Sequence, residues 1–263
     1  MMANWYDYPA YWEMAFAENT KPEADFIEAC CRKYVSGETR RLLEPACGSG
    51  RLVVEMAKRG YQLAGFDLNQ PSLDYLQQRL TKLQLPAYVF AADMADFSLK
   101  QTFDAAFNTF STFRLLLTEE QAENHLRCVA AALRPGGIYL LGLHLLPPDA
   151  SEESTERWRA SRGQTTVNYT LRVTSCDRRA RWENMRAMIT VKNATGKRRL
   201  ATEFSFRLYT AAQLRSLIAK VTDFELCDVY DYCYEIDNPL KLNNELADVI
   251  LILRKKQRTR TRT

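Results

Sequence analysis

The chain has 263 residues, of which 46% are hydrophobic, and its formal net charge is +4. This composition can build one large domain, or one domain that carries a sizeable insertion. No apolar run reaches the roughly 18 residues of a membrane helix, and the N-terminus lacks a secretory pattern. Cys30 and Cys31 are adjacent, the other five cysteines are scattered and there are two histidines, which argues against a disulfide framework and a zinc site. We expect a reduced, cytoplasmic protein with no metal and no membrane attachment.

Positive charge is concentrated in one segment of the chain. Residues 157–215 contain 14 Lys or Arg and 3 Asp or Glu, and residues 254–263 add six basic side chains. The remainder is acidic. The basic segment is either a solvated outer face or a contact for an anionic acceptor, for a second subunit or for RNA.

Hydrophobic periodicity divides the first half of the chain into regular elements. The aromatic stretch from Tyr8 to Phe16 predicts a helix, and a second helix follows from Glu23 to about Tyr34. Strands and helices then alternate. The expected strands cover residues 40–46, 61–67, 87–93, 103–110 and 138–146, and the expected helices cover residues 51–59, 71–85 and 119–133, the last behind a capping box at Thr118–Gln121.

The spacing of hydrophobic residues changes after residue 148. Residues 165–173 alternate apolar and polar side chains, and residues 186–208 form two more alternating runs around a turn. These runs predict inserted antiparallel strands. The remaining elements are a helix behind a second capping box at Thr210–Gln213 and a hairpin of two strands, residues 224–236 and 247–255.

Alternating strands and helices are typical of an α/β fold, here a doubly wound, seven-stranded, mostly parallel sheet with inserted antiparallel β-strands. The predicted organisation is an N-terminal helical segment (1–35), a core (36–150 and 208–254), an inserted β segment (151–207) and a disordered basic tail (255–263).

A glycine loop joins the first strand of the core to the next helix, in the sequence LLEPACGSGRL. Glycines let the backbone approach a ligand closely, and the helix N-terminus presents free N–H groups. A Walker loop requires Gly-Lys-Ser/Thr, which Arg51 and Leu52 do not supply. A dinucleotide loop requires a third glycine or alanine where Val53 stands. The third class of glycine loop in this position, and the one that these residues still allow, binds S-adenosylmethionine.

The spacing of further motifs resembles that of class I S-adenosylmethionine-dependent methyltransferases of the small-molecule type. Glu44-Pro-Ala-Cys-Gly-Ser-Gly50 is similar to their first motif, acid-x-x-x-Gly-x-Gly. Asp67 ends the second strand in GFDLN, Asp93 ends the third in AADMADF, and LRPGG precedes the fifth. The resemblance covers roughly residues 35–145 and 208–254. It implies the Rossmann-like methyltransferase fold with an antiparallel last strand.

The resemblance also implies roles for individual residues. Asp67 accepts from both ribose hydroxyls, Leu68 lies against the adenine, and Asp93 and Met94 bind the adenine edge. Glu44 faces the ammonium group of the cofactor. An acidic pocket of this kind suits a cationic sulfonium and repels a pyrophosphate. The complete set expected to bind S-adenosylmethionine, or its product S-adenosylhomocysteine, is Tyr11, Glu44, Ala46, Gly48, Gly50, Asp67, Leu68, Asp93, Met94 and Asn108.

Structural roles compete with these assignments. Asp67 and Asp93 could only shape turns, Glu44 could pair with Arg40 or Arg41, and the N-terminal aromatics could only anchor their helix. The resemblance instead places the N-terminal helices and the inserted strands over the active site as a lid.

Methyl transfer from a sulfonium is an in-line displacement that needs positioning more than a catalytic group. His144, at the end of the fifth strand, is the best candidate for a general base, although a structural role competes with it. His125 is expected to be exposed on its helix. Cys47 is expected to be a small packing residue and not a nucleophile.

The predicted function is methyl transfer to an O or N nucleophile of a small molecule, by a monomer or homodimer. The first alternative is a nucleic-acid or protein methyltransferase that uses the basic insertion, although the insertion contains no known RNA-binding module. The second is a non-catalytic module that binds S-adenosylmethionine. The third is a nicotinamide oxidoreductase.

Overall fold

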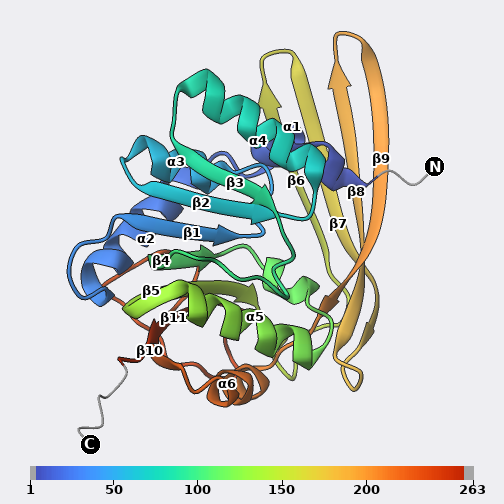
Figure 1. Ribbon diagram of the computed structural model, residues 1–263. Helices are drawn as coiled ribbons and strands as arrows, with labels where there is room; N and C mark the ends of the chain where they lie inside the picture. The colour runs from blue at the N-terminus through green and yellow to red at the C-terminus, as the bar shows by residue number, and fades with distance from the viewer. Residues whose placement is uncertain (1–3, 258–263) are drawn as a thin grey trace, which may run out of the picture.

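A computed structural model describes residues 4–257 of the chain (Figure 1). A seven-stranded sheet runs through its centre in the order β10-β11-β5-β4-β1-β2-β3. The strands are β1 (Arg41–Pro45), β2 (Gln62–Asp67), β3 (Ala87–Ala91), β4 (Phe103–Asn108), β5 (Leu133–His144), β10 (Phe224–Tyr230) and β11 (Asp248–Lys255). β11 runs antiparallel to both of its neighbours and the other neighbouring pairs are parallel, which confirms the predicted fold class.

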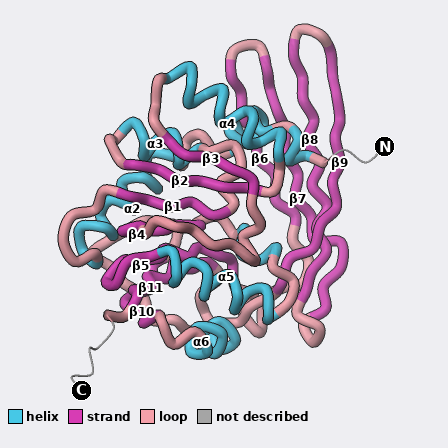
Figure 2. Tube along the Cα trace, viewed as in Figure 1, coloured by secondary structure: helices cyan, strands magenta, loops and turns pink. Residues whose placement is uncertain are grey.

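Helices cover both faces of this sheet (Figures 1 and 2). One face packs against α5 (Glu119–Ala132), α6 (Ala211–Lys220) and the short helix η2 (Thr112–Leu115). The other packs against α2 (Thr20–Tyr34), α3 (Arg51–Lys58) and α4 (Gln70–Leu83). The central strands are apolar on both sides for this reason.

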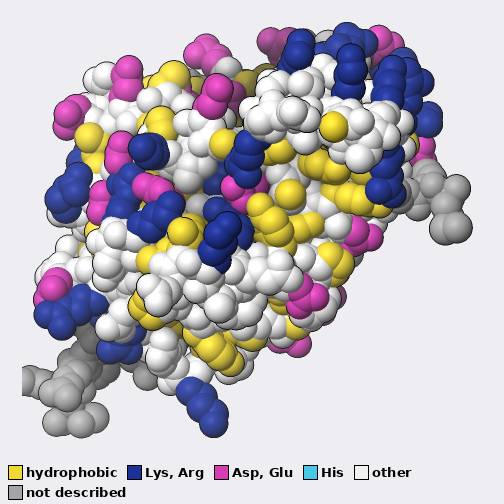
Figure 3. All heavy atoms as spheres, turned by 90° about the horizontal axis from the view of Figure 1, so that it is seen from above, with side chains coloured by type: hydrophobic (Ala, Val, Ile, Leu, Met, Phe, Trp, Pro, Cys, Tyr) yellow, Lys and Arg dark blue, Asp and Glu magenta, His cyan; other side chains and the backbone are white. Residues whose placement is uncertain are grey.

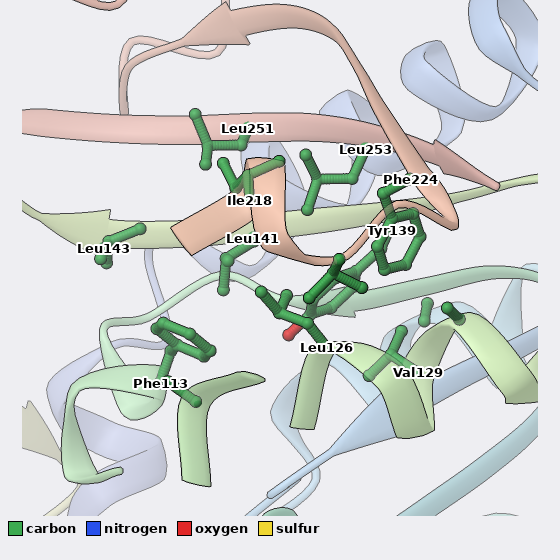
Figure 4. Close-up of a cluster of buried hydrophobic side chains, with 14 of the residues drawn as sticks. Phe113, Leu126, Val129, Tyr139, Leu141, Leu143, Ile218, Phe224, Leu251 and Leu253 are labelled. Carbon is green, nitrogen blue, oxygen red and sulfur yellow. The ribbon is translucent and has the colours of Figure 1, made fainter. Parts of the chain in front are cut away.

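Successive residues of one strand therefore pack into two different hydrophobic cores, one on each face of the sheet. Tyr139 and Leu141 of β5 lie with Leu251 and Leu253 of β11 under α5 and α6 (Figure 4). Leu140, between the two β5 residues, belongs to the core on the opposite face. Both predicted capping boxes are present at the starts of α5 and α6.

A second sheet of four antiparallel strands is inserted after β5. Its strands, in spatial order, are β6 (Thr155–Arg162), β7 (Thr165–Asp177), β8 (Trp182–Asn193) and β9 (Gly196–Arg207). The sequence predicted three of them. β6 was missed because arginines flank Trp158 and Ala160, so its apolar alternation is short.

The N-terminal segment packs on the inserted sheet. The 3-10 helix η1 (Trp5–Asp7) and α1 (Pro9–Ala15) place their aromatic side chains against Val167, Tyr169 and Ile189 of that sheet. Figure 1 shows the carboxyl ends of β1, β2 and β3 pointing toward this assembly. The N-terminal helices and the inserted sheet therefore face the edge where ligands bind in doubly wound folds.

The last two strands pair antiparallel as predicted, but β10 ends at Tyr230 and the connection to β11 spans residues 231–247. This long connection replaces the short hairpin that the sequence indicated. The disorder predicted for residues 255–263 falls largely outside the described residues; Lys255 itself ends β11.

No helix within residues 4–257 is long and apolar enough to cross a membrane. No group of three or more His, Cys, Asp or Glu side chains in the same range could hold a metal ion.

Candidate functional site

The glycine loop between β1 and α3 has an unusual backbone. Ala46, Gly48 and Gly50 have φ angles of 52°, 52° and 68°. A β-carbon at Gly50 would lie 2.2 Å from Cδ1 of Leu76, so helix α4 and the backbone angle both require glycine. A non-glycine residue with positive φ, such as Ala46, is uncommon and marks a constrained loop.

Asp67 closes this loop from the end of β2. Its Oδ2 accepts a hydrogen bond from the Gly48 N–H at 2.7 Å, and its Oδ1 accepts one from the Asn69 N–H at 2.8 Å. Burial raises the pKa of Asp67, and the backbone N–H groups of Asn69, Gly48 and Leu68 oppose this shift. Next to it, the side chain of Leu68 is 70% exposed. A carboxylate and an exposed apolar side chain thus lie together beside the loop.

Two buried oxygen atoms near the loop have no hydrogen-bond partner among the described residues. They are Glu44 Oε2 at the end of β1 and Asn108 Oδ1 at the end of β4. The amide nitrogen of Asn108 donates to the Pro45 carbonyl at 3.0 Å, which holds the two strand ends together. Burial raises the pKa of Glu44 well above its usual range, although Arg51 opposes the rise. Unpaired buried acceptors are costly, so this pair indicates a missing donor.

Arg51 and Glu23 form a buried ion pair that the sequence analysis missed. Glu23, from α2, is 0% exposed and also accepts a hydrogen bond from the Thr109 hydroxyl. Arg51 also donates to the Thr20 hydroxyl at 3.3 Å. Arg40, a partner considered for Glu44, pairs with Glu38 instead. Glu23 stands in the first turn of a predicted helix, so sequence alone does not indicate that α3 would cover it.

The loop after β3 carries Asp93 and Met94. The Ala92 N–H donates to the Asp67 carbonyl at 3.2 Å, which places this loop beside the end of β2. Asp93 Oδ1 accepts from the Ala95 N–H at 2.8 Å, so the carboxylate shapes the turn. It remains exposed.

His125 holds this loop from α5, and its predicted exposure is wrong. It is 0% exposed, its Nδ1–H donates to the Met94 carbonyl at 2.8 Å, and its Nε2 accepts from the Tyr139 hydroxyl at 2.8 Å. Burial lowers its pKa to about 4, so the ring is neutral. The helical spacing of Ala122, His125, Leu126 and Val129 places all four on one buried stripe, and that periodicity was the available signal.

His144 ends β5 on the same edge of the sheet. Its Nδ1 hydrogen-bonds to Asp248, the residue directly opposite it on β11, and its backbone N–H donates to the Ser111 hydroxyl at 3.0 Å. The ring also contacts Tyr232 edge-on. An exposed imidazole beside a carboxylate can take up a proton.

Tyr11 and Cys47 complete the predicted set. The backbone carbonyl of Tyr11 accepts from the Tyr169 hydroxyl, and its ring stacks on Tyr8, so these contacts join it to the inserted sheet and to the residue after η1. The Cys47 thiol is buried and burial raises its pKa well above the ordinary value. A protonated thiol of this kind is a poor nucleophile.

Comparison with known proteins identifies the class that this strand order and glycine loop define. Residues 42–137 match a family model described as a methyltransferase domain. These residues therefore form a methyltransferase domain.

Sequence relatives share this part of the chain. Identity to the dTDP-3-amino-3,4,6-trideoxy-alpha-D-glucopyranose N,N-dimethyltransferase of Streptomyces venezuelae is 31% over 104 residues, which is 40% of this chain and 42% of that protein. Identity to the cypemycin N-terminal methyltransferase of a Streptomyces species is 30% over 102 residues, or 39% and 41% of the two chains. The chain spans only 41% to 57% of the length of the curated relatives it matches.

Solved structures resemble the whole fold. An S-adenosylmethionine-dependent methyltransferase from Clostridium acetobutylicum superimposes with a TM-score of 0.78 at 16% identity, over 97% of this chain and 100% of that one. DesVI of Streptomyces venezuelae superimposes with a TM-score of 0.77 at 20% identity, over 95% and 97%. The inserted sheet and N-terminal helices are thus part of a shared architecture.

Proposed function

We propose that the protein transfers a methyl group from S-adenosylmethionine to an O or N nucleophile of a small molecule. The observation that carries this proposal is the pair of unpartnered buried acceptors, Glu44 Oε2 and Asn108 Oδ1, next to the glycine loop. The ammonium group of the cofactor's amino-acid end supplies hydrogen-bond donors and positive charge, which is what this pair lacks.

The other residues fit the rest of the cofactor. Asp67 offers carboxylate oxygens for a ribose diol, and the exposed Leu68 offers an apolar surface for an adenine. Asp93 and the Met94 backbone, fixed by His125, would bind the adenine edge. Gly48 leaves open space where a side chain would otherwise stand, because a β-carbon there would meet no atom within 4 Å.

When bound, S-adenosylmethionine supplies an activated methyl group on a positively charged sulfur. The protein's part is to hold the acceptor in line, exclude water and remove a proton. We assign water exclusion to the N-terminal helices and the inserted sheet, which act as a lid. Phe16 contacts both Phe110, in the loop after β4, and Trp158 of the inserted sheet, and we assign these three rings as an aromatic wall for the acceptor.

Nitrogen is the favoured acceptor atom. The Streptomyces venezuelae relative is named as an N,N-dimethyltransferase of an amino sugar, and a structural neighbour, KedS8, is named as a sugar N-methyltransferase. An ammonium acceptor must lose a proton before its lone pair can attack. We assign the acceptance of that proton to the His144 imidazole, whose Nδ1 hydrogen-bonds to Asp248.

The function is tested by incubating the protein with isotopically labelled S-adenosylmethionine and a fractionated metabolite extract, followed by mass spectrometry. Labelled product is expected in a fraction of small amines. Absence of any heat when the folded protein is titrated with S-adenosylhomocysteine would reject the cofactor assignment. Heat without labelled product would instead indicate a non-catalytic binding module.

Replacing His144 with glutamine is expected to slow label transfer by about 10²- to 10⁴-fold, the usual contribution of a general base. Affinity for S-adenosylhomocysteine should stay within a factor of two to three. The measurement is the rate of label incorporation from the same extract across pH. An unchanged rate would mean that the acceptor reaches the site already deprotonated.

Binding of S-adenosylhomocysteine is expected to release a proton from Glu44. Burial raises the pKa of this carboxyl in the ligand-free protein, and a nearby ammonium favours its charged form. Affinity should therefore increase as pH rises from the usual carboxyl range through the raised pKa. Calorimetry in two buffers of different ionisation enthalpy should show a buffer-dependent heat that Glu44→Gln removes. A heat independent of buffer in the unmodified protein would contradict this assignment.

A further inference from the structure

Nearly all of the charged side chains on the outer face of the inserted sheet are basic. The face that packs on the N-terminal helices carries Val167, Tyr169 and Ile189. The intervening residues of each strand point the other way. The exposed cationic residues on that outer face are Arg157, Arg159, Arg172, Arg186, Lys192, Lys197 and Arg199. Figure 3 shows Lys and Arg gathered on the side of the molecule that the inserted hairpins occupy.

Few of these charges are neutralised within the described chain. The acidic residue among them is Glu203, which lies 3.8 Å from Arg186. No described residue forms an ion pair or hydrogen bond with the other six side chains. They differ in this respect from Arg178, Arg181 and Arg207 of the same segment, which bind carboxylates or backbone carbonyls.

Two like-charged pairs stand directly opposite each other across strands. Arg172 of β7 faces Arg186 of β8, and Lys192 of β8 faces Lys197 of β9. Directly opposed like charges destabilise an antiparallel sheet, because their β-carbons are about 4.5–5.5 Å apart. Glu203, which faces Arg186 from β9, offsets part of the first repulsion, whereas no described carboxylate pairs with Lys192 or Lys197. A ligand that brings negative charge would relieve both repulsions.

A groove of about 950 Å³ lies beside β8 and β9. Its lining combines Asn168, Thr170, Arg186 and Arg199 of the outer face with Arg198 of the opposite face and with Asp7 and Tyr8 of the N-terminal segment. Guanidinium groups match phosphate oxygens in a bidentate geometry, and the neighbouring amide and hydroxyls add hydrogen bonds. Cations two residues apart on one strand are about 6.6–6.8 Å apart, and adjacent strands are about 4.8 Å apart.

We propose that the outer face of the inserted sheet binds the phosphate backbone of a single-stranded nucleic acid. The charges extend over all four strands, which suits an extended polyanion better than one phosphate group. The large apolar side chains exposed on this face, Trp182 and Met188, are six residues apart and about 20 Å from each other, so they form no patch for a protein or a bilayer. Pairing with the same face of a second copy would oppose two basic surfaces. Binding is therefore sequence-independent and separate from the methyl-transfer site.

Fluorescence anisotropy with labelled poly(U) RNA tests the proposal on the full chain. Each phosphate contact releases counterions, so about four contacts predict roughly 50-fold weaker binding at 200 mM than at 50 mM salt. The variant Arg172→Glu/Lys192→Glu converts both like-charged pairs into opposite-charged pairs. It should bind RNA at least tenfold more weakly while its melting temperature stays the same or rises.

The matched control is Lys58→Glu/Lys82→Glu, which makes the same change in net charge at exposed positions of α3 and α4. It should bind RNA within about twofold of the unmodified protein. Equal losses in both variants would show that net charge alone attracts RNA and would overturn the proposal. So would absence of binding at 50 mM salt, or binding to phosphatidylserine vesicles without binding to RNA. Binding of S-adenosylhomocysteine should not change in either variant, which keeps this result distinct from the methyltransferase assignment.

Discussion

Replacement of Asp67 by alanine is expected to lower the affinity for S-adenosylmethionine by roughly 10- to 150-fold, about 1.5–3 kcal/mol. Asp67 is the carboxylate at the end of β2, and its two oxygens also hold the N–H groups of Gly48 and Asn69. The substitution removes the proposed acceptor for the ribose diol and loosens the glycine loop at the same time. Both effects weaken binding.

Titration calorimetry with S-adenosylhomocysteine measures this loss. Asp74→Ala, on the exposed side of the neighbouring helix α4, serves as the matched control and should bind normally. Asp67→Asn keeps one acceptor oxygen but not the charge, so its affinity should fall between those of the other two proteins. If Asp67→Ala bound as tightly as Asp74→Ala, the end of β2 would not be the ribose site.

Arg114→Ala is expected to destabilise the fold by about 3–5 kcal/mol, because it leaves a buried carboxylate without its counter-ion. Arg114, in η2, is 6% exposed and pairs with Glu183 of β8, which is 8% exposed. Its Nε also donates to the Arg207 carbonyl at 3.0 Å, and the guanidinium lies over the ring of Phe206. These contacts join the inserted sheet to the core.

Urea denaturation measures the free energy of unfolding, and the double variant Arg114→Leu/Glu183→Leu is the control. It replaces both charges by apolar groups, so it should recover most of the lost stability. Arg254→Ala removes an exposed ion pair with Glu225 and should cost less than about 1 kcal/mol. An effect of Arg114→Ala no larger than that of Arg254→Ala would mean that the inserted sheet is held mainly by its aromatic contacts.

Much of this molecule follows from local sequence. The strand and helix alternation, the two capping boxes and the turn between β8 and β9 depend on residues within a few positions of one another. The glycine loop, Asp67 at the end of β2 and Asp93 after β3 are also recognised from residues that are neighbours in the sequence. The seven strands of the sheet could therefore be predicted, and so could the sheet edge that carries Glu44, Asp67 and Asp93. The reversal of β11 was implied by the resemblance to class I methyltransferases and not by a local pattern.

Other features depend on which distant segments pack together. The buried pair of Arg51 and Glu23 forms because α2 lies against α3, and neither residue signals the other in sequence. His125 is buried because the loop after β3 brings the Met94 carbonyl against α5. β6 exists as the edge of a sheet whose neighbour provides its hydrogen bonds.

Periodicity and turn chemistry act over short distances, so the sequence by itself determined most of the elements, their order and the acidic glycine loop, but not β6 or the long connection between β10 and β11. Tertiary structure alone decided which charges are buried as pairs and which stay on an open face. It also decided that a buried oxygen of Glu44, at the end of β1, and one of Asn108, at the end of β4, stay without a partner among the described residues. The physical reason is that desolvation depends on everything packed around a group, and those neighbours come from parts of the chain that no local pattern connects.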